Sequence, residues 1–549
     1  MSEPTAATAA RVKADPPDRV DVAIIGAGPS GLTAGAFLAA QGLSVACFDG
    51  HYVAGGCVTQ FRRGRKDSRY HFDVGLHYIG DCGTDGMIPT LLRGVGAQVD
   101  FAAMDPDGFD ELVFPDLRFA IPVGHDRYRQ RLLDAFPAEK KGINRYTRFL
   151  VELDKVARMT DRTGGKTTAG VMWKVVTGGR LVARYQNATL AQVLDDCTTD
   201  PRLRAVIAGQ NGDYALPPSK VAAVLHAGLS NHYLRGAYYP KGGGQVISDA
   251  LAERLEAAGG GIYLRRTVEK VLIEDGRAVG VTLAAKRGQE ARQIRAGVVL
   301  SGADYQRTLL ELVGPEHLPS DLVTKTTNHT LPAALFMTCL GVTGEIPQMR
   351  ASNYWQFDSF DFEASYRAID DGPPKTFCAY ITSATHKDPD NAAHHAPAGV
   401  TSVEVMSLVT GDFKQWGVSE GDLFRRGYRG DARYEDLKAR LQDDLIARLE
   451  GVFPGTRARV CFAESATPVT HTRYTRASGG TGYGLACTPE QFLAKRPGFR
   501  GPIPGLFLCG ASTRSGHGVV GAMSSGYLSA KRVARELNVT LPALPWIDA

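Results

Sequence analysis

The order of apolar and polar positions near the amino end predicts a strand, a tight turn and a helix. Residues 22–25 form a short apolar run, which is typical of a buried strand. The glycines that follow have the spacing G-x-G-x-x-G and are Gly26, Gly28 and Gly31. An Ala- and Leu-rich stretch then predicts a helix that ends near Gly42, and residues 44–48 predict a second strand that ends at Asp49.

This succession of strand, glycine turn, helix, strand and acid is typical of a dinucleotide-binding unit. Gly26 is expected to turn the chain tightly, Gly28 to let backbone N–H groups approach a pyrophosphate, and Gly31 to let the helix pack on the strand. The start of the helix offers unpaired N–H groups and the positive end of its dipole to the phosphates. Asp49 lies 18 residues after Gly31, where an acid is expected to bind the hydroxyl groups of a ribose.

Two later stretches predict further parts of the same unit. The middle stretch predicts a helix, an alternating strand, a hairpin and one more strand, at 246–258, 262–271, 274–283 and 297–300. The alternating strand contains Val268, a further candidate for binding the cofactor, and the Asp275-Gly276 pair favours a tight hairpin turn. Near the carboxyl end, an apolar run over 505–509 meets Gly510 and leads into a glycine-rich segment and a helix.

The length of the chain, 549 residues, exceeds one ordinary core, so about two domains are expected. We expect an α/β protein with a Rossmann-like dinucleotide-binding domain formed by residues 19–105, 236–305 and 500–549. The remaining segments are richer in aromatic residues and prolines and predict an interleaved α+β substrate-binding domain, at 106–235 and 306–499. Residues 1–18 are rich in Ala, Thr and Pro and predict a disordered tail, because they lack the apolar core of a signal peptide.

The composition is that of a globular protein and excludes several functions. The net charge is only +5 and no Lys/Arg-rich run is present, so a nucleic-acid partner is not expected. The nine cysteines are scattered and form no C-x-x-C pair, which favours reduced thiols in the cytoplasm and no zinc site. No apolar stretch approaches the ~20 residues that span a bilayer, so only peripheral contact with a membrane is compatible with the chain.

Further glycines favour FAD as the dinucleotide. Gly55 and Gly56 follow shortly after Asp49, as in the FAD-binding extension of the amine-oxidase-like flavoproteins. Near the carboxyl end, three residues resemble the second flavin-contacting segment of these proteins, in which a glycine turn and a helix start approach the isoalloxazine: Gly510, Gly518 and Val519.

Four segments spread over the chain carry a more specific resemblance. Residues 72–80 resemble an F-D-x-G-x-H-Y-x-G stretch, and residues 238–243 resemble a Y-P-x-G-G segment. Residues 467–468 with 481–484 resemble a T-P…T-Y-G pattern into which Gly482 is inserted, and residues 505–526 resemble a carboxyl-terminal flavin segment. Together they resemble the phytoene desaturase, carotenoid isomerase and retinol saturase family of FAD-dependent oxidoreductases, closest to the retinol saturase-like branch.

The resemblance implies FAD, a hydrophobic tunnel and an isoprenoid or polyene substrate of the carotenoid or retinoid kind. It implies saturation, isomerisation or desaturation of carbon–carbon double bonds, and desaturation would require quinone or oxygen as electron acceptor. Because the flavin carries the hydride chemistry, the protein needs only one or two polar groups that transfer a proton. The candidates for catalysis are His77, Tyr239, Tyr483 and His517, and Tyr78 is a further polar side chain next to His77.

The sequence leaves several alternatives open. The two histidines are equally compatible with hydrogen-bonded core residues, and the tyrosines with the lining of a tunnel. An amine-oxidase-like flavoprotein with a polar substrate, or a non-catalytic protein that binds a flavin or lipid, fits the same motifs. Residues 171–185 interleave apolar and basic side chains and are compatible with a membrane-facing patch or with an ordinary amphipathic surface. No metal-ligand spacing is present.

Overall fold

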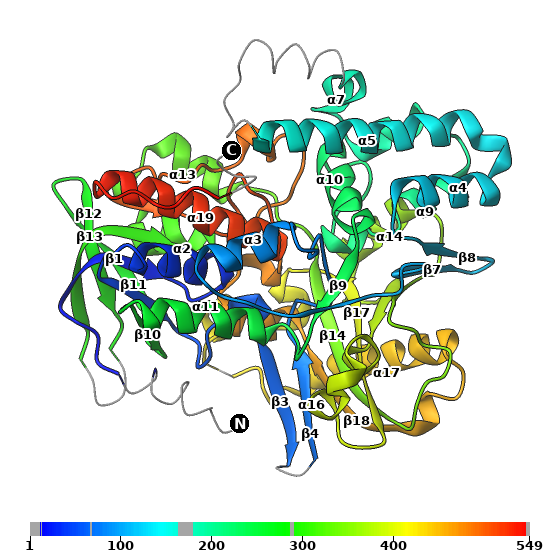
Figure 1. Cartoon of the computed structure of the whole chain (residues 1–549). Coiled ribbons are helices and arrows are strands. Elements are labelled where there is room, and N and C mark those ends of the chain that lie inside the picture. The colour runs from blue at the N-terminus through cyan, green and yellow to red at the C-terminus, as the bar shows by residue number, and fades with distance from the viewer. Residues whose placement is uncertain are drawn as a thin grey trace.

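The structure is a computed structural model that describes residue 11 and residues 14–65, 68–162, 179–285, 290–425 and 427–544. Most of the predicted tail and most of the predicted patch at 171–185 lie outside the described residues, although the end of the patch forms α7 (Arg180–Tyr185). Two large sheets and the helices around them organise the described chain (Figure 1).

The first sheet contains the predicted dinucleotide-binding pattern and has seven strands among the described residues. The strands are β1 (Arg19–Ile25), β2 (Val45–Asp49), β10 (Gly261–Leu264), β11 (Val268–Glu274), β12 (Arg277–Leu283), β13 (Arg292–Ser301) and β19 (Leu506–Leu508). Their order is β10-β2-β1-β13-β12-β11, and β19 also pairs with β13. β10, β2, β1, β13 and β19 pair in parallel, whereas β11 and β12 are antiparallel additions.

Both faces of this sheet are buried, which explains the uninterrupted apolar run in β1. Val22 and Ile24 pack into a cluster with the helices on one face, whereas Ala23 and Ile25 pack into a cluster on the other face. A strand buried on both sides shows no polar alternation. The helices on the first face are α2 (Pro29–Ala39), α3 (Met87–Gly94), α11 (Gln245–Ala257) and α19 (Gly518–Glu536) (Figure 1).

The predicted strand over 262–271 is wrong in one respect, because the structure divides it into β10 and β11. Arg265, between them, has a φ of 54°, so the chain turns there. β10 then pairs in parallel with β2, whereas β11 pairs with β12 across the predicted hairpin. That hairpin is confirmed: Asp275 and Gly276 both have positive φ, 48° and 72°, as a primed two-residue turn requires.

The second sheet also has seven strands among the described residues, in the order β18-β14-β17-β16-β15-β7-β8. Their bounds are β7 Asp110–Phe114, β8 Leu117–Ile121, β14 Ala334–Thr343, β15 Asn353–Phe357, β16 Cys378–Thr382, β17 Val400–Val409 and β18 Val460–Ala466. All pairs are antiparallel except β15 with β7. α17 (Ala432–Val452) packs against one face, and the other face carries a large cluster rich in aromatic rings.

Smaller elements connect the two sheets. β3 (Gln60–Arg65) and β4 (Ser68–Asp73) form a hairpin, and β5 (Ile79–Gly80) and β6 (Phe101–Ala103) both pair with β9 (Ala237–Pro240). The backbone N–H of Asp73 donates a hydrogen bond of 3.0 Å to Glu404 of β17. The predicted division into two discontinuous domains stays a prediction.

Helices complete the described chain around the second sheet and between the sheets. They are α4 (His125–Ala135), α5 (Lys140–Arg162), α8 (Leu190–Asp195), α9 (Pro201–Ile207), α10 (Ala223–Leu234), α12 (Tyr305–Arg307), α13 (Ser320–Thr327), α14 (Phe362–Asp370), α15 (Ala384–Lys387), α16 (Ala392–His395) and α18 (Pro468–Thr475). Within the described ranges, none of the helices has the length and apolar character that crossing a membrane requires.

We expect Gly31→Ala to destabilise the fold, because a Cβ there would lie 2.0 Å from the backbone oxygen of Gly26. Overpacking against backbone costs about 1–3 kcal/mol or more. Chemical denaturation measures this cost. The matched control is Gly451→Ala in α17, where a Cβ meets no atom within 4 Å and where alanine is expected to add roughly 0.5–1 kcal/mol of stability. Equal stabilities of the two variants would contradict the packing argument.

Candidate functional site

The glycine turn after β1 has the geometry that its sequence predicts. Gly26 has a φ of 96°, and its N–H donates a 2.8 Å hydrogen bond to the carbonyl of Phe48 at the end of β2. Gly28 is the N-cap of α2, and no side chain caps this helix start. The N–H groups of the first turn of α2 are therefore available to a ligand.

Gly55 and Gly56 close the other side of this turn. The N–H of Gly55 donates a 2.7 Å hydrogen bond to the carbonyl of Ala27, and both glycines have positive φ, 130° and 55°. A Cβ on Gly56 would lie 3.1 Å from the Cα of Gly28, whereas a Cβ on Gly28 would meet only Gly56, at 4.0 Å. The two backbones thus form a narrow cradle that side chains would fill.

Asp49 and Val268 lie close to the same end of β2. One carboxylate oxygen of Asp49 accepts the N–H of Ala27 at 2.8 Å, and the other accepts the N–H of His51 at 2.7 Å. The carbonyl of Asp49 accepts the N–H of Arg266, two residues before Val268. Asp49 therefore holds the glycine turn in place, and its predicted contact with a ribose stays a prediction.

The carboxyl-terminal candidates lie beside the start of α2. Gly510 follows β19 with a φ of 98°, and a Cβ there would lie 3.5 Å from the Oγ of Ser30 in α2. Gly526 of α19 approaches so closely that a Cβ would lie 2.3 Å from the carbonyl oxygen of Ser30. Gly518, the first residue of α19, has a φ of 76° and open space within 4 Å of a Cβ, and Val519 beside it is partly buried.

A second G-x-G-x-x-G, which sequence reasoning missed, begins α19 at Gly516, Gly518 and Gly521. A Cβ on Gly521 would lie 2.5 Å from the carbonyl oxygen of Gly516, the same close approach that relates Gly31 to Gly26. The start of α19, like that of α2, carries no side-chain cap. The uncapped start of α2, with open space at Gly28, fits the diphosphate of a dinucleotide, and the start of α19 at Gly518 is a second uncapped helix start.

Among the predicted catalytic residues, His77 has the side chain with the fewest hydrogen bonds. Its ring is buried, and neither ring nitrogen has a hydrogen-bond partner among the described residues. Nδ1 lies 3.6 Å from a carboxylate oxygen of Glu404, which is itself buried. The imidazole can therefore still accept or donate a hydrogen bond to a ligand.

Tyr239 lies within a buried group of charged side chains. Its hydroxyl donates to one carboxylate oxygen of Asp73, whose other oxygen accepts the N–H of Gly244 at 2.8 Å. The ammonium of Lys387 lies 4.5 Å from the centre of the Tyr239 ring and donates to the carbonyl of His77. Burial lowers the pKa of Lys387 to about 8, although Glu404 and Asp73 favour its charged form. These contacts hold the loops that carry His77 and Gly244.

The polar atoms of Tyr483 and His517 already have partners. The Tyr483 hydroxyl donates to the carbonyl of Gly212 at 2.8 Å. His517 Nε2 lies 3.0 Å from the carbonyl oxygen of Asp213, and Nδ1 lies 3.4 Å from the thiol of Cys487. Burial lowers the pKa of His517 to about 4, so the ring is neutral at pH 7. A neutral ring bonds with Nε2–H as donor to the carbonyl and Nδ1 as acceptor from the thiol.

A chain of buried polar contacts runs between these candidates. Lys387 donates to Thr382 at 2.5 Å, Thr382 donates to Asn353 at 2.8 Å, and Asn353 donates to Asp110 at 2.9 Å. The chain ends where the Tyr78 hydroxyl lies between the carboxyls of Asp110 and Asp213, at 3.1 and 2.6 Å.

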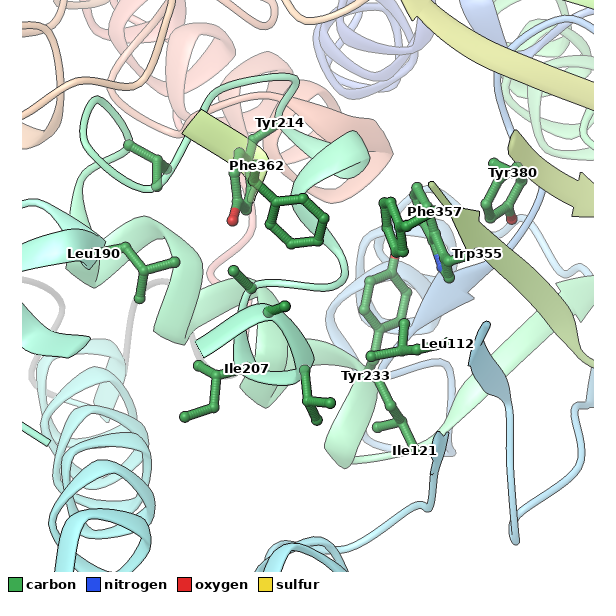
Figure 2. Packing of buried hydrophobic residues seen from close by; sticks show 14 of the residues in the cluster. Leu112, Ile121, Leu190, Ile207, Tyr214, Tyr233, Trp355, Phe357, Phe362 and Tyr380 are labelled. Atoms are coloured by element: carbon green, nitrogen blue, oxygen red, sulfur yellow. The ribbon is translucent and has the colours of Figure 1, made fainter. Parts of the chain in front are cut away.

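Aromatic rings surround this end of the chain. The rings of Tyr78 and Tyr233 are stacked at 4.1 Å, and those of Trp355 and Tyr380 meet at 4.4 Å. Figure 2 shows Tyr233, Trp355, Phe357 and Tyr380 gathered from α10 and neighbouring strands of the second sheet. An aromatic environment of this kind buries apolar substrate surface and strengthens polar interactions within it.

Sequence reasoning missed the acidic and basic members of this group. Glu404 offered a signal, since it is a lone charge inside the apolar run 400–409. Asp213 follows Asn-Gly in a pattern typical of a turn, and Lys387 lies in a short polar stretch. Asp110 belongs to none of the motifs that the sequence predicts. Their partnership depends on pairing between segments more than a hundred residues apart, for which one sequence offers no evidence.

The fold and the glycine cradle define a protein with a Rossmann-like dinucleotide-binding domain. The model of the NAD(P)-binding Rossmann-like domain family matches residues 24–93. Among solved structures, wild-type putrescine oxidase bound to putrescine is similar with a TM-score of 0.59 and 15% identity, over 94% of this chain and 99% of that chain. The predicted fold class is therefore confirmed.

Two groups of proteins are similar to this chain over nearly its full length. All-trans-retinol 13,14-reductase of Danio rerio is 26% identical over 96% of this chain and 88% of its own. The chloroplastic prolycopene isomerase of Daucus carota is 25% identical over 96% of this chain and 82% of its own. The predicted resemblance to the retinol saturase and carotenoid isomerase family is thereby confirmed.

We expect Gly28→Ala to fold normally and to bind the dinucleotide more weakly. The φ and ψ of Gly28, −76° and 178°, suit alanine, and the nearest atom to the new Cβ is 4.0 Å away. The methyl group would occupy the approach to the first turn of α2 and remove at least one hydrogen bond to a phosphate, worth about 1.5–3 kcal/mol. Binding should therefore weaken at least ~10-fold.

Two measurements on the purified variant check this, namely its melting temperature and the absorbance of the dinucleotide released per mole of protein. Full retention of the dinucleotide by a stable Gly28→Ala variant would show that the cradle is not its binding site.

Proposed function

We propose that this protein is an FAD-dependent oxidoreductase that acts on carbon–carbon double bonds of a hydrophobic isoprenoid or polyene. The observation that carries the proposal is the cradle of Gly28 and Gly56 at the uncapped start of α2, within a chain that is similar throughout to retinol reductases and prolycopene isomerases. A bound flavin supplies hydride transfer. The direction, whether saturation, isomerisation or desaturation, is left to experiment.

The chain's own residues have distinct parts in this proposal. The glycine segments 26–31, 55–56 and 510–519 bind the dinucleotide, and Asp49 with Val268 lies at its adenosine end. The aromatic cluster on the second sheet binds the polyene and excludes water. The first sheet and its helices thus form the cofactor domain, and the second sheet forms the substrate domain.

Of the four predicted catalytic residues, we propose that His77 alone contacts the substrate through its polar group. Its ring nitrogens are free among the described residues, whereas Tyr239, Tyr483 and His517 are held by other groups. These three then support the walls of the site. This division of roles follows from which of the four side chains have polar atoms that already make hydrogen bonds.

Amine oxidation is the second candidate, because a carboxyl group, that of Asp213, lies among aromatic rings. Burial, followed by the charge of Asp110, raises the pKa of Asp213 well above its usual range. A carboxyl that is held neutral donates a hydrogen bond or a proton, and it does not neutralise a substrate ammonium. Action on a polyene is therefore favoured over amine oxidation.

The substrate class also bears on where the protein works. A polyene partitions into lipid, so we propose that the protein is cytoplasmic and meets membranes peripherally to acquire it. The electron partner is proposed to be a quinone or oxygen if the reaction runs as a desaturation.

Anaerobic turnover tests the proposed function. The released cofactor is identified by mass, the loaded protein is photoreduced, and all-trans-retinol, prolycopene or putrescine is added. We expect FAD, and we expect a saturated or isomerised product from a polyene and no reaction with putrescine. Reduction of the oxidised protein by putrescine would favour amine oxidation. The absence of both electron exchange with any of the three and isomerisation of a polyene would favour a non-catalytic carrier.

A further inference from the structure

Two buried carboxyl groups share a single tyrosine hydroxyl in the aromatic cluster. Asp213 ends the 3₁₀ turn Asn211–Asp213, Asp110 is the first residue of β7, and Tyr78 precedes β5. The Tyr78 oxygen lies 2.6 Å from Asp213 Oδ2 and 3.1 Å from Asp110 Oδ2. Both distances are those of hydrogen bonds.

The number of hydrogen atoms available for these two contacts decides whether the carboxyl group of Asp110 or that of Asp213 carries a proton. A tyrosine hydroxyl has one hydrogen, so it can donate to only one of the two acids. Asp110 also accepts N–H groups from Gln210 at 2.7 Å and from Asn353 at 2.9 Å, and these donors favour its ionised form. Tyr78 therefore donates to Asp110, and Asp213 must carry its own hydrogen to bond with the Tyr78 oxygen.

The surroundings of Asp213 agree with a neutral acid. Within the described chain, no Arg or Lys side chain makes a hydrogen bond to it. Burial, followed by the charge of Asp110, raises its pKa well above the usual range, whereas the pKa of Asp110 rises to about 6. The titratable groups that face Asp213 are Tyr78, Asp110, Tyr214, Tyr233, Tyr380, Tyr483 and His517.

Asp213 also lies between the predicted cofactor segment and the aromatic rings. Its carbonyl accepts a hydrogen bond from His517, the N-cap of α19, and its neighbour Gly212 accepts one from Tyr483. The Asp213 residue keeps accessible surface, whereas Asp110 has none. Of the two acids, Asp213 is therefore the less buried residue and the better placed for contact with a substrate.

We propose that Asp213 is the acid that protonates a carbon of the substrate double bond, an inference that rests on the proposed function. In saturation the π bond breaks and two C–H bonds form. One hydrogen arrives with both electrons as hydride from the reduced flavin, which is oxidised, and the other leaves Asp213 Oδ2 as a proton. When Asp213 becomes a carboxylate, the Tyr78 hydroxyl turns its hydrogen from Asp110 to Asp213, while Gln210 and Asn353 still donate to Asp110. Asp213 then regains its proton from solvent.

Infrared spectroscopy of the protein without substrate tests the protonation of Asp213. A protonated carboxyl has a C=O stretching band apart from that of a carboxylate, and the band shifts in D₂O. At pH 8, where Asp110 is ionised, Asp213→Asn should remove one such band. The matched control is Asp116→Asn, an exposed carboxylate paired with Arg202, which should leave the bands unchanged. Persistence of all acid bands in Asp213→Asn would overturn the proposal.

Turnover of all-trans-retinol by the photoreduced holoenzyme tests the proton transfer. Asp213→Asn should keep its flavin and lower the rate at least ~100-fold. The wild-type rate should fall as pH rises and Asp213 ionises. Asp110→Asn removes a like charge and lowers the pKa of Asp213, so this fall should begin at lower pH. A merely structural role for Asp213 would not shift the profile in this direction.

A comparison of variants at His77 and Asp213 shows which of the two residues delivers the proton. In D₂O, deuterium on the product carbon marks the proton that the enzyme delivers. If His77→Gln abolishes product formation while Asp213→Asn turns over like the wild type, the assignment to Asp213 is wrong. If the wild type converts no polyene, the proposed function and the catalytic role fail together, and the infrared result still decides which acid is protonated.

Discussion

Close contact between backbones at the ends of three parallel strands sets the geometry on which the site depends. Gly26 follows β1, Gly302 follows β13 and Gly510 comes shortly after β19. A Cβ on Gly26 would lie 3.4 Å from the carbonyl carbon of Gly302, and one on Gly510 would lie 3.5 Å from its oxygen. Gly26 and Gly510 also have a positive φ, 96° and 98°, which L side chains rarely adopt, so a side chain at either position would strain the turn. These glycines allow segments hundreds of residues apart to meet at one edge of the sheet, where the start of α2 packs against α19 at Gly526.

The second constraint is electrostatic. The buried charges Asp73, Glu404, Lys387 and Asp110 lie where the small elements connect the sheets, and each has a hydrogen-bonded or oppositely charged neighbour. Burying such groups is costly, and replacing them by apolar side chains is often neutral or stabilising. Their presence is therefore weak evidence for stability. It is better explained by the need to hold His77, Tyr78 and Asp213 in fixed positions within an apolar environment.

Much of the cofactor side could be predicted from sequence, because its geometry is local. The strand–turn–helix of residues 22–42 needs glycines at fixed spacing, and the Asp275-Gly276 hairpin needs two residues that tolerate positive φ. The division of 262–271 into β10 and β11 escaped prediction, since only the pairing with β2 and β12 reveals it. The glycines at the start of α19 have the same spacing as those of α2, but they follow a loop and not a strand, so they do not complete the strand–turn–helix pattern.

The substrate side could not be predicted to the same extent. Asp213 and Asp110 acquire their chemistry from one tyrosine hydroxyl and from Gln210 and Asn353, which come from separate elements. An aspartate in a polar turn has no unusual property in the sequence. The resemblance to polyene-modifying enzymes indicated His77 and its neighbours, and it carried no information about which acid is neutral.

The pairing of β13 has a consequence for biosynthesis. One edge of β13 lies along β1, while the other edge is shared, with residues 292–295 paired to β12 and residues 299–301 paired to β19. During translation, β19 is made some 480 residues after β1, so the nascent sheet keeps an unpaired strand edge until Leu506–Leu508 has been made. Exposed edges of this kind invite wrong pairing. Stalled or truncated chains that end before Leu506 should therefore be the aggregation-prone species that chaperones meet.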